Sequence, residues 1–243
     1  MPNMLTQKLE LFGALPDEDR ALLDEVAAQG HAVAARTDLI IEGDAPSDVH
    51  LVLEGFACRY KLMPDGRRHI FAFMLPGDFC DLNIFILKAM DHNIGTLTRC
   101  VIADIPRKRI LEMVERPQLA RALWWATLVD EATLREWLVN LGQRGAEQRI
   151  AHLLCEIHLR LQVIGLAGAS SFKLPLTQEV IADTMGLSNV HVNRMLVKLR
   201  DDGLIEIEGR SIDLLDIKRI RAMCDFDPNY LHLEGGRETR ASA

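Results

Sequence analysis

The sequence lacks a hydrophobic run long enough to cross a membrane. Spanning the hydrocarbon layer as a helix takes about 18 to 20 consecutive apolar residues, and no stretch of the chain reaches that length although 49% of its 243 residues are hydrophobic. The first residues, MPNMLTQKLELFG, also lack the basic head, apolar core and small-residue cleavage site of a secretory leader. We therefore expect a cytoplasmic protein with enough apolar residues for one large core or two modest ones.

An excess of positive charge is missing as well. The 28 lysines and arginines are outnumbered by 35 aspartates and glutamates, and the formal net charge is -7. This balance excludes a protein that binds nucleic acid through bulk attraction of its whole surface. Any contact with nucleic acid has to be local.

Closely paired cysteines are also absent. The five cysteines stand at positions 58, 80, 100, 155 and 224, and no two of them form a CxxC pair. An odd number of distant cysteines argues against a disulfide framework and against a zinc or iron-sulfur site. Buried, reduced thiols are the prediction.

Glycines at regular intervals mark residues 37–105. They stand at positions 43, 55, 66 and 77, and β-rich runs such as HLVLEG and RHIFAFML lie between them. Such spacing is typical of short strands joined by turns, so this segment predicts a small β-roll. A capping helix is expected just before the roll, within LFGALPDEDRALLDEVA, where Pro16 stands near the helix start.

A long helix is predicted after the roll. Gln118–Leu141 contains no glycine or proline, and apolar or small residues recur there every three or four positions. Trp124 and Leu128 lie off this stripe, so the helix has to be covered on more than one side. We expect the roll on one side and a second copy of the helix on the other, although a core helix of a monomer is the open alternative. The expected dimer interface comprises Leu119, Leu123, Ala126, Val129, Thr133, Trp137 and Leu141.

The run LTQEVIADTMGLSNVHVNRMLVKL has the pattern of two short helices joined by a tight turn. Thr177 is placed to cap a helix over Gln178–Met185, and Gly186 is placed to end that helix in the left-handed conformation. Ser188 then caps a second helix, and the small Ala182 stands where the two would cross. This arrangement is typical of a helix-turn-helix. An ordinary solvated helical hairpin is the alternative, and the matched spacing of the buried aliphatic residues argues against it.

The remaining motifs complete a winged helix. GQRG at 142–145 predicts a hinge, and AEQRIAHLLCEIHLRLQVIG predicts a helix after it. Beyond Gly203, the runs LIEIEG and SIDLLD predict two strands around a Glu-Gly-Arg-Ser turn, which would form the wing. IKRIRAMC then predicts a closing helix with a basic side.

Taken together, these motifs make the chain similar to the bacterial family of the cyclic-AMP receptor protein and the fumarate and nitrate reduction regulator, the Crp/Fnr family. The resemblance covers about residues 11–224 and is strongest in the helix-turn-helix. It implies an α+β fold with an N-terminal cyclic-nucleotide-binding-like β-roll, a long dimerisation helix and a C-terminal winged helix-turn-helix. It implies a homodimeric transcription regulator, not an enzyme, that reads a near-palindromic operator. The expected domains are a β-roll sensor domain at 1–116, a dimerisation helix at 117–143, a DNA-binding domain at 144–224 and a flexible tail at 225–243.

The resemblance also suggests roles for the exposed row of the second helix, residues 189–200. Arg194 matches the family's guanine-reading arginine, whose fork suits O6 and N7 of guanine. Asn189 and Asn193 suit adenine edges or phosphates, and Val190 suits a thymine methyl group where many family members carry glutamate. Lys198 is placed for phosphate. The expected DNA-binding residues are Thr177, Gln178, Ser188, Asn189, Val190, Asn193, Arg194 and Lys198.

The ligand of the roll does not follow from the resemblance. Cyclic-nucleotide binders of the family hold the phosphate with a glutamate and an Arg-Ser pair, because a buried anion needs a cation and hydroxyl donors. The corresponding stretch, GDFCDLNIFILKAMDHNIGTLTRC, has no Arg-Ser, and Met90 and Asp91 stand near the expected place. The N-terminal cysteine cluster of the oxygen-sensing members is absent, because the first cysteine is Cys58. We therefore expect neither cyclic AMP nor an iron-sulfur cluster, and the effector stays open.

Single residues in the roll are weak candidates for a sensor. Cys58, Cys80 and Cys100 are isolated thiols, and His69 and His92 are isolated candidates for haem or metal. Residues of these types that stand alone are mostly inert packing or surface groups. No metal site is expected.

Two other classes of protein are alternatives. A cupin-type metalloenzyme also uses a roll, but it needs a His-x-His pair that the roll lacks. A regulatory cyclic-nucleotide-like module without DNA binding would have no use for an intact helix-turn-helix. The expected partners are therefore double-stranded DNA, a second copy of the chain and RNA polymerase, with no membrane.

Overall fold

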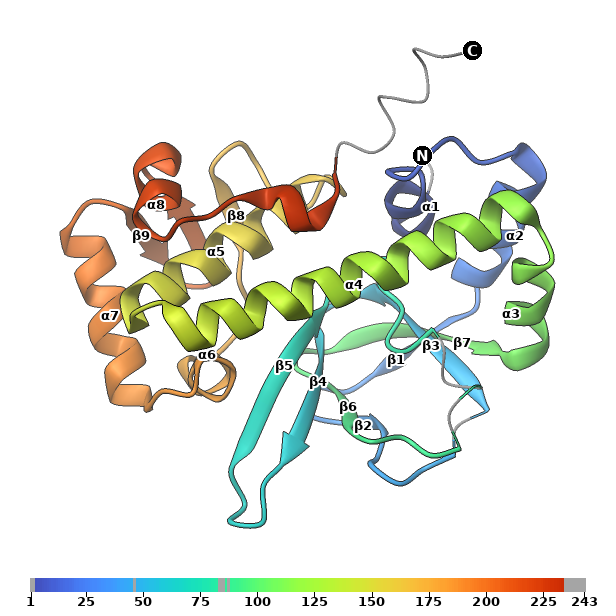
Figure 1. Cartoon of the computed structure of the whole chain (residues 1–243), viewed down its shortest axis with the longest axis horizontal. Coiled ribbons are helices and arrows are strands. Elements are labelled where there is room, and N and C mark those ends of the chain that lie inside the picture. The colour runs from blue at the N-terminus through green and yellow to red at the C-terminus, as the bar shows by residue number, and fades with distance from the viewer. Residues whose placement is uncertain (1–2, 46, 83–85, 87, 234–243) are drawn as a thin grey trace. The chain divides into compact units, whose positions relative to one another are not determined.

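The computed structural model describes residues 3–45, 47–82, 86 and 88–233. The chain divides into two compact units (Figure 1). The described parts of Met1–Lys61 and Ala72–Glu131, with His232 and Leu233, form the first unit, and Leu62–Phe71 and Ala132–Leu231 form the second. The boundary falls inside the helix α4 (Pro117–Gln143), so both units share this helix.

Two β-sheets form the roll, which belongs to the first unit except for Leu62–Phe71. One sheet has the strand order β1-β7-β3 and the other the order β2-β6-β4-β5. The strands are β1 (Gly30–Val33), β2 (Asp38–Ile40), β3 (Asp48–Glu54), β4 (Ala57–Leu62), β5 (Arg68–Met74), β6 (Asn93–Thr96) and β7 (Cys100–Pro106). The turn after β3 shows why glycine recurs. Gly55 has a φ of 86°, and a Cβ there would lie 2.5 Å from the carbonyl oxygen of Arg99, so no larger residue fits. The β-roll predicted from the glycine spacing is confirmed.

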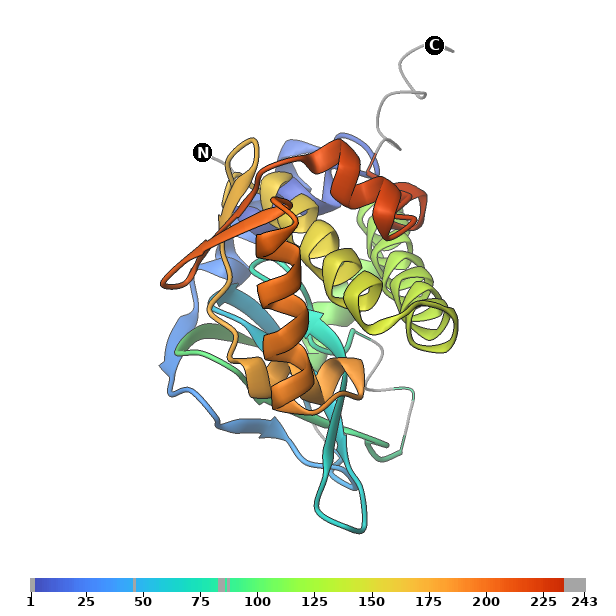
Figure 2. The same ribbon diagram turned by 90° about the vertical axis from the view of Figure 1, so that its left-hand side faces the viewer.

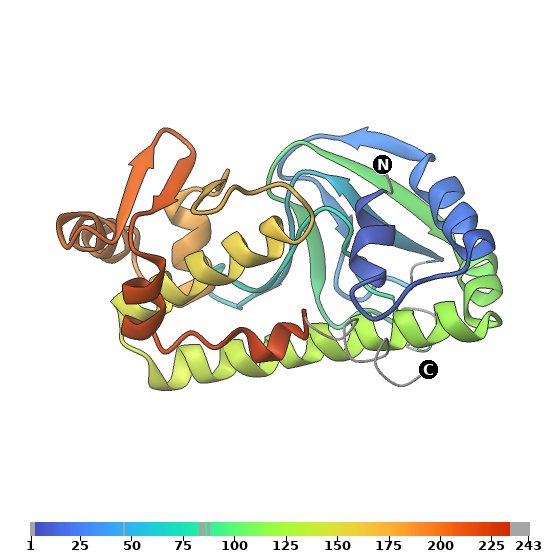
Figure 3. The ribbon, with the colours of Figure 1, turned by 90° about the horizontal axis from the view of Figure 1, so that it is seen from above.

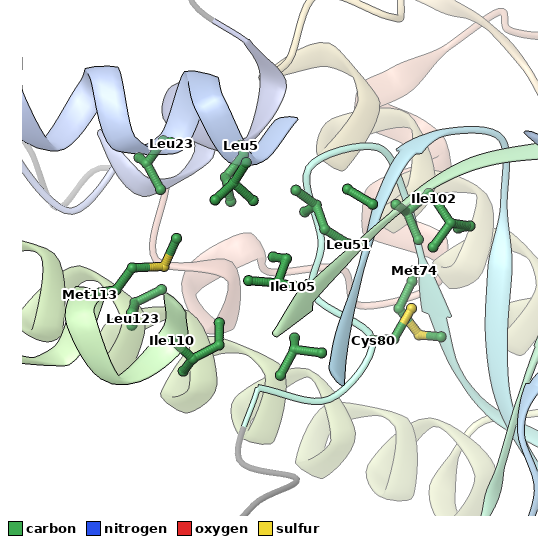
Figure 4. Packing of buried hydrophobic residues seen from close by; sticks show 14 of the residues in the cluster. Leu5, Leu23, Leu51, Met74, Cys80, Ile102, Ile105, Ile110, Met113 and Leu123 are labelled. Atoms are coloured by element: carbon green, nitrogen blue, oxygen red, sulfur yellow. The ribbon is translucent and has the colours of Figure 1, made fainter. Parts of the chain in front are cut away.

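Helices complete the core of the first unit. They are α1 (Met4–Leu9), α2 (Asp17–Ala27) and α3 (Arg107–Val114), of which the sequence pattern predicted only α2, with Pro16 at its N-cap. Leu5 of α1, Leu23 of α2 and Met113 of α3 are fully buried against strand residues such as Leu51 and Ile102 (Figure 4). Each such side chain contributes about 1.5 to 3 kcal/mol of hydrophobic stabilisation, so the helices are integral parts of the unit.

The inward face of α4 carries the stripe that was expected to bind a second copy. Leu119, Leu123 and Trp137 are only 0%, 1% and 4% exposed in the single chain, and Ala126, Val129, Thr133 and Leu141 beside them are half-buried. These three residues are already covered within the single chain, so they have little surface left for a partner. A regular apolar period shows that a face is covered, but it does not show by what.

The outward face of α4 carries the uncovered apolar residues. Trp124, Leu128 and Leu138 are 74%, 59% and 64% exposed, and Leu134 and Val139 are also exposed. At 100° per residue, Trp124, Leu128 and Leu138 fall within about 80° of one another on the helix surface. Scattered exposed leucines are ordinary, but a row of large ones along one helix marks an interaction surface.

The second unit contains the predicted winged helix. Its elements are α5 (Ala146–Gln162), β8 (Ser171–Lys173), α6 (Gln178–Met185), α7 (Asn189–Asp201), β9 (Ile205–Glu208), β10 (Ser211–Leu214) and α8 (Ile217–Met223). The two strands of the wing pair antiparallel, with Ser211 opposite Glu208 across the turn, as predicted. The strand β8 was not predicted and adds to the other edge of β10. The helix α7 packs along α5 (Figure 2).

The residues that follow α8 differ from the expected flexible tail. A short 3-10 helix, η1 (Pro228–Leu231), lies there, and Phe226, Tyr230 and Leu231 are buried. Figure 3 shows this stretch running beside the C-terminal half of α4. Polar and apolar residues follow one another irregularly in DFDPNYL, with neither a helical nor a strand period, so the pattern did not reveal the burial. The rest of the expected tail, from residue 234, lies outside the described residues.

A neutral histidine lies under this C-terminal stretch. His152 of α5 is fully buried, with its ring 5.0 Å from that of Phe226 and 6.0 Å from that of Tyr230. Burial and, to a smaller extent, the positive charge of Arg144 lower the pKa of His152 to about 3. The ring is therefore uncharged at neutral pH, although Nε2 lies 3.2 Å from Oε1 of Glu136.

This histidine makes stability depend on pH. A pKa of about 3 in the folded state and about 6.5 in the unfolded state means that the unfolded chain binds the proton more readily. The contribution of the neutral His152 ring to the free energy of unfolding is complete above pH 6.5. It is lost as the pH falls toward 3, at about 1.4 kcal/mol per pH unit. We expect the free energy of unfolding, measured by urea titration at about pH 7.5 and pH 5.0, to fall less for His152→Phe than for the parent. Equal losses in both proteins would contradict this assignment.

Candidate DNA-binding surface

The helix-turn-helix forms as its local sequence predicts. The hydroxyl of Thr177 accepts a hydrogen bond from the backbone N–H of Val180 at 3.2 Å and so caps α6. The hydroxyl of Ser188 accepts from the N–H of His191 at 3.3 Å and caps α7. Between them, Gly186 has a φ of 63°, the left-handed conformation that ends α6 at low cost. The turn is therefore set by its own residues.

Burial fixes the orientation of α7. Val192 and Leu199 of α7 are fully buried, and Ile181, Ala182 and Met185 of α6 are buried with them. The small Ala182 lets the helices approach, and its carbonyl oxygen accepts a hydrogen bond from the N–H of Leu187 at 3.1 Å. The opposite side of α7 has to face outward as a result.

The structure brings all the expected DNA-binding residues to one exposed surface. They occupy the N-terminal ends of α6 and α7 and the outward side of α7, and all are exposed: Thr177, Gln178, Ser188, Asn189, Val190, Asn193, Arg194 and Lys198. Val190, in the first turn of α7, is 70% exposed. Arg194 has no ion-pair partner among the residues that the structure describes. Its guanidinium is therefore available to a ligand.

Lys198 differs from its neighbours, because carboxylates already bind it. Its Nζ lies 2.5 Å from Oε2 of Glu147 in α5 and 3.3 Å from Oδ2 of Asp202. The hydrogen bond to Glu147 is the main reason that the pKa of Lys198 is raised. A phosphate would have to displace these partners. The partner Glu147 lies 51 residues away in the sequence, and no local pattern reveals it.

Other charges near the surface were not predicted. Arg210 lies exposed in the turn of the wing, but the exposed Glu206 and Glu208 flank it on β9, so the wing adds little positive potential. Arg68 at the start of β5 contacts the other side of α6, with Nε 2.8 Å from Oδ2 of Asp183. Arg68 and Asp183 are 115 positions apart in the sequence, so no local pattern predicts that they pair.

The isolated cysteines of the roll and His92, which are candidates for a sensor, are largely covered in the structure. All five cysteines are buried and free, as predicted, and burial raises the pKa of the Cys80 and Cys100 thiols. The His92 Nδ1 atom lies 2.6 Å from Oδ1 of Asp91, whose side chain is 80% exposed. Asp91 is therefore a surface residue, whereas Met90 beside it is buried. Positions 83–85 and 87 of the same stretch lie outside the described residues.

The roll, the long helix and the winged helix with its exposed polar row define a class of protein: a DNA-binding transcription regulator with an N-terminal domain of the cyclic-nucleotide-binding type. Within the described residues, no helix is long and apolar enough to cross a membrane, and no three potential metal ligands form a group.

Comparison with known proteins agrees with this class. Residues 148–223 match the Crp-like helix-turn-helix domain, and residues 31–117 match the cyclic nucleotide-binding domain. The chain is 38% identical over 188 residues to the nitrogen fixation regulation protein FixK of Bradyrhizobium diazoefficiens, covering 75% of this chain and 76% of FixK. It is 31% identical to the transcriptional activator protein FnrL of Cereibacter sphaeroides, covering 84% and 83% of the two chains.

A solved structure supports the same assignment. FixK2 from Bradyrhizobium japonicum superposes with a TM-score of 0.70 at 27% identity, covering 80% of this chain and 96% of FixK2. The chain belongs to the Crp/Fnr family of transcription regulators. It is a DNA-binding regulator and not an enzyme, which excludes the cupin-type alternative.

Proposed function

We propose that the protein is a homodimer that binds a specific, near-palindromic operator through α7 and regulates transcription there. The observation that carries the proposal is the exposed row of α7, held outward by a buried face and bordered by two capped helix N-termini. A rigid helix with an uncommitted arginine and two asparagines suits the major groove, where each base pair presents a distinct pattern of donors and acceptors. RNA polymerase is the proposed partner at the promoter.

The residues of the row divide into those that read bases and those that position the protein. Arg194 donates its two forked N–H groups to O6 and N7 of a guanine, and Asn189 and Asn193 bond adenine edges or phosphates. Val190 contacts a thymine methyl group, and it has no oxygen to accept from N4 of cytosine. Thr177, Gln178 and Ser188 bind phosphates at helix N-termini, where backbone N–H groups and the helix dipole favour anions. The net charge of -7 makes this local arrangement necessary.

The dimer is proposed to form through the outward face of α4. Its support is the row of large exposed residues that includes Trp124, Leu128 and Leu138, which a second copy would cover. A two-fold symmetric protein places two α7 helices about 34 Å apart, one turn of DNA, and so requires a near-palindromic site. The proposal of a two-fold symmetric dimer therefore carries with it the proposal of a near-palindromic operator.

The effector is proposed to be neither cyclic AMP nor an iron-sulfur cluster. The Arg-Ser pair that would hold a phosphate is missing from residues 77–100, and the N-terminal cysteine cluster that would hold iron is missing as well.

Selection of binding sites from a random double-stranded DNA library tests the function. We expect one enriched motif with two inverted half-sites whose centres are about 10 base pairs apart. Binding of the selected DNA has to persist at moderate salt, because the affinity for a specific site exceeds that for nonspecific DNA by about 10³-fold or more. Enrichment of no motif, or binding that disappears in salt equally for all sequences, would favour a regulatory module without DNA binding.

A further inference from the structure

The junction between α4 and α5 is held in place by residues that follow α8. Only Arg144 and Gly145 separate the two helices, and glycines on both sides of Arg144 predict a flexible hinge. Arg144 instead donates from Nη2 to the backbone carbonyl of Asp225 at 3.1 Å. Gln148, in the first turn of α5, donates from Nε2 to the carbonyl of Met223 at 3.0 Å. The first contact ties the hinge to the chain beyond the matched DNA-binding domain, and the second ties it to the last residue of α8.

A buried carboxylate joins the same three parts of the unit. Glu156 of α5 is fully buried. Its Oε2 accepts hydrogen bonds from Nε1 of Trp137 in α4 at 2.9 Å and from the hydroxyl of Tyr230 in η1 at 2.8 Å. Arg160 donates to Oε1 at 3.1 Å. A buried carboxylate needs its donors, because losing one leaves the desolvation of the charge uncompensated. Glu156 therefore connects α4, α5 and η1 at one point.

Aromatic contacts complete this connection. The ring of His152 packs against those of Phe226 and Tyr230, and the guanidinium of Arg221 in α8 lies 5.5 Å above the centre of the Phe226 ring. The stretch after α8 is thus fixed to α5 and α8 by its rings and to α4 through Glu156. Neither set of contacts touches the exposed row of α7.

We propose that Cys224–Leu231, here called the brace segment, fixes the angle between α4 and α5 and thereby the separation of the two α7 helices in the dimer. The inference rests on the proposed function. The matched helix-turn-helix domain ends at residue 223, so the brace segment lies beyond it. A dimer gains affinity from its second half-site only if the geometry allows both to bind at once. A loose hinge would reduce the affinity gained from the second half-site without altering the exposed row of α7 in either protomer.

The first test needs no DNA. Backbone hydrogen exchange is followed by mass spectrometry in the full chain carrying Tyr230→Ala or Tyr230→Phe. Asn229→Ala, an exposed neighbour in the same segment, is the matched control. We expect Tyr230→Ala to speed exchange in residues 141–149 by about tenfold or more, since local opening sets the rate, while α6 and α7 stay as protected as in the parent. Tyr230→Phe keeps the ring and loses the hydroxyl, so its effect is intermediate.

The second test measures affinity for three duplexes: a single half-site, the selected palindrome, and the palindrome with one base pair added between the half-sites. We expect Tyr230→Ala to bind the half-site like the parent, within about twofold, but to bind the palindrome about 10- to 100-fold more weakly. The preference for the unaltered spacing should shrink by the same factor. Asn229→Ala should match the parent on all three duplexes.

The outcomes separate the brace from the proposed function. If the parent binds palindrome and half-site alike, the proposed dimeric function fails, and the exchange experiment still decides whether the brace segment holds the junction. If Tyr230→Ala weakens half-site and palindrome equally, or exchanges faster in α7 as much as in residues 141–149, the segment merely stabilises the whole unit and the proposal is overturned. If Tyr230→Ala does not fold, Tyr230→Phe gives the decision by the same criteria.

Discussion

Replacing Leu128 and Leu138 together by glutamate is expected to convert the protein into a folded monomer. Both side chains are exposed on the outward face of α4, so the change costs little in the single chain but places four charges in the apolar interface of a dimer. Each buried leucine contributes about 1.5 to 3 kcal/mol, and an unpaired buried charge costs more. Affinity for the palindromic operator should fall by about 10² to 10⁴-fold, because the advantage of a second half-site is lost. Light scattering and operator titration measure the two effects.

A matched change on the inward face controls this experiment. Trp137→Glu also adds a carboxylate to α4, but Trp137 is buried and its Nε1 donates to Glu156. We expect this variant to lose the cooperative unfolding of the second unit rather than to yield a stable monomer. A dimer mass for the Leu128→Glu, Leu138→Glu protein at micromolar concentration would show that the outward face of α4 is not the interface.

The two faces of α4 show what periodicity predicts and what it cannot. The spacing of apolar residues predicted the helix and nearly its bounds, because a helical period is a local property. From the same spacing we expected a second copy of the helix to cover the apolar stripe, although Leu119 and Leu123 pack inside the chain. Which element covers an apolar face depends on tertiary packing, and the strongest apolar stripe is the one that the chain itself buries first.

The candidate site was predictable for a related reason. The caps Thr177 and Ser188, the left-handed Gly186 and the buried face of α7 all follow from residues within one short stretch. By contrast, the pairing of Lys198 with Glu147 and the binding of Tyr230 to Glu156 join distant positions. These contacts engage the ammonium group of Lys198 and join η1 to α5, and no local pattern records them.

Arg194→Ala is expected to weaken binding to the selected operator by about 1 to 3 kcal/mol, which is about 5- to 150-fold. It should also remove the base preference at one position of each half-site. Arg194 has the geometry for this role because it is exposed on α7 and has no ion-pair partner within the described part of the chain. Site selection and competition titration with the parent and the variant measure both effects.

Two further variants separate base reading from charge. Arg194→Lys keeps the positive charge but loses the planar fork that pairs with guanine, so it should lose the base preference while keeping the salt dependence of the parent. Lys198→Ala should weaken all sequences alike, and only slightly, because Glu147 and Asp202 already bind the ammonium group. Its salt slope should change by less than the value of about 1 per site that a free phosphate-binding lysine contributes. An Arg194→Ala protein that selects the same half-site as the parent would show that another residue of α7 reads the groove.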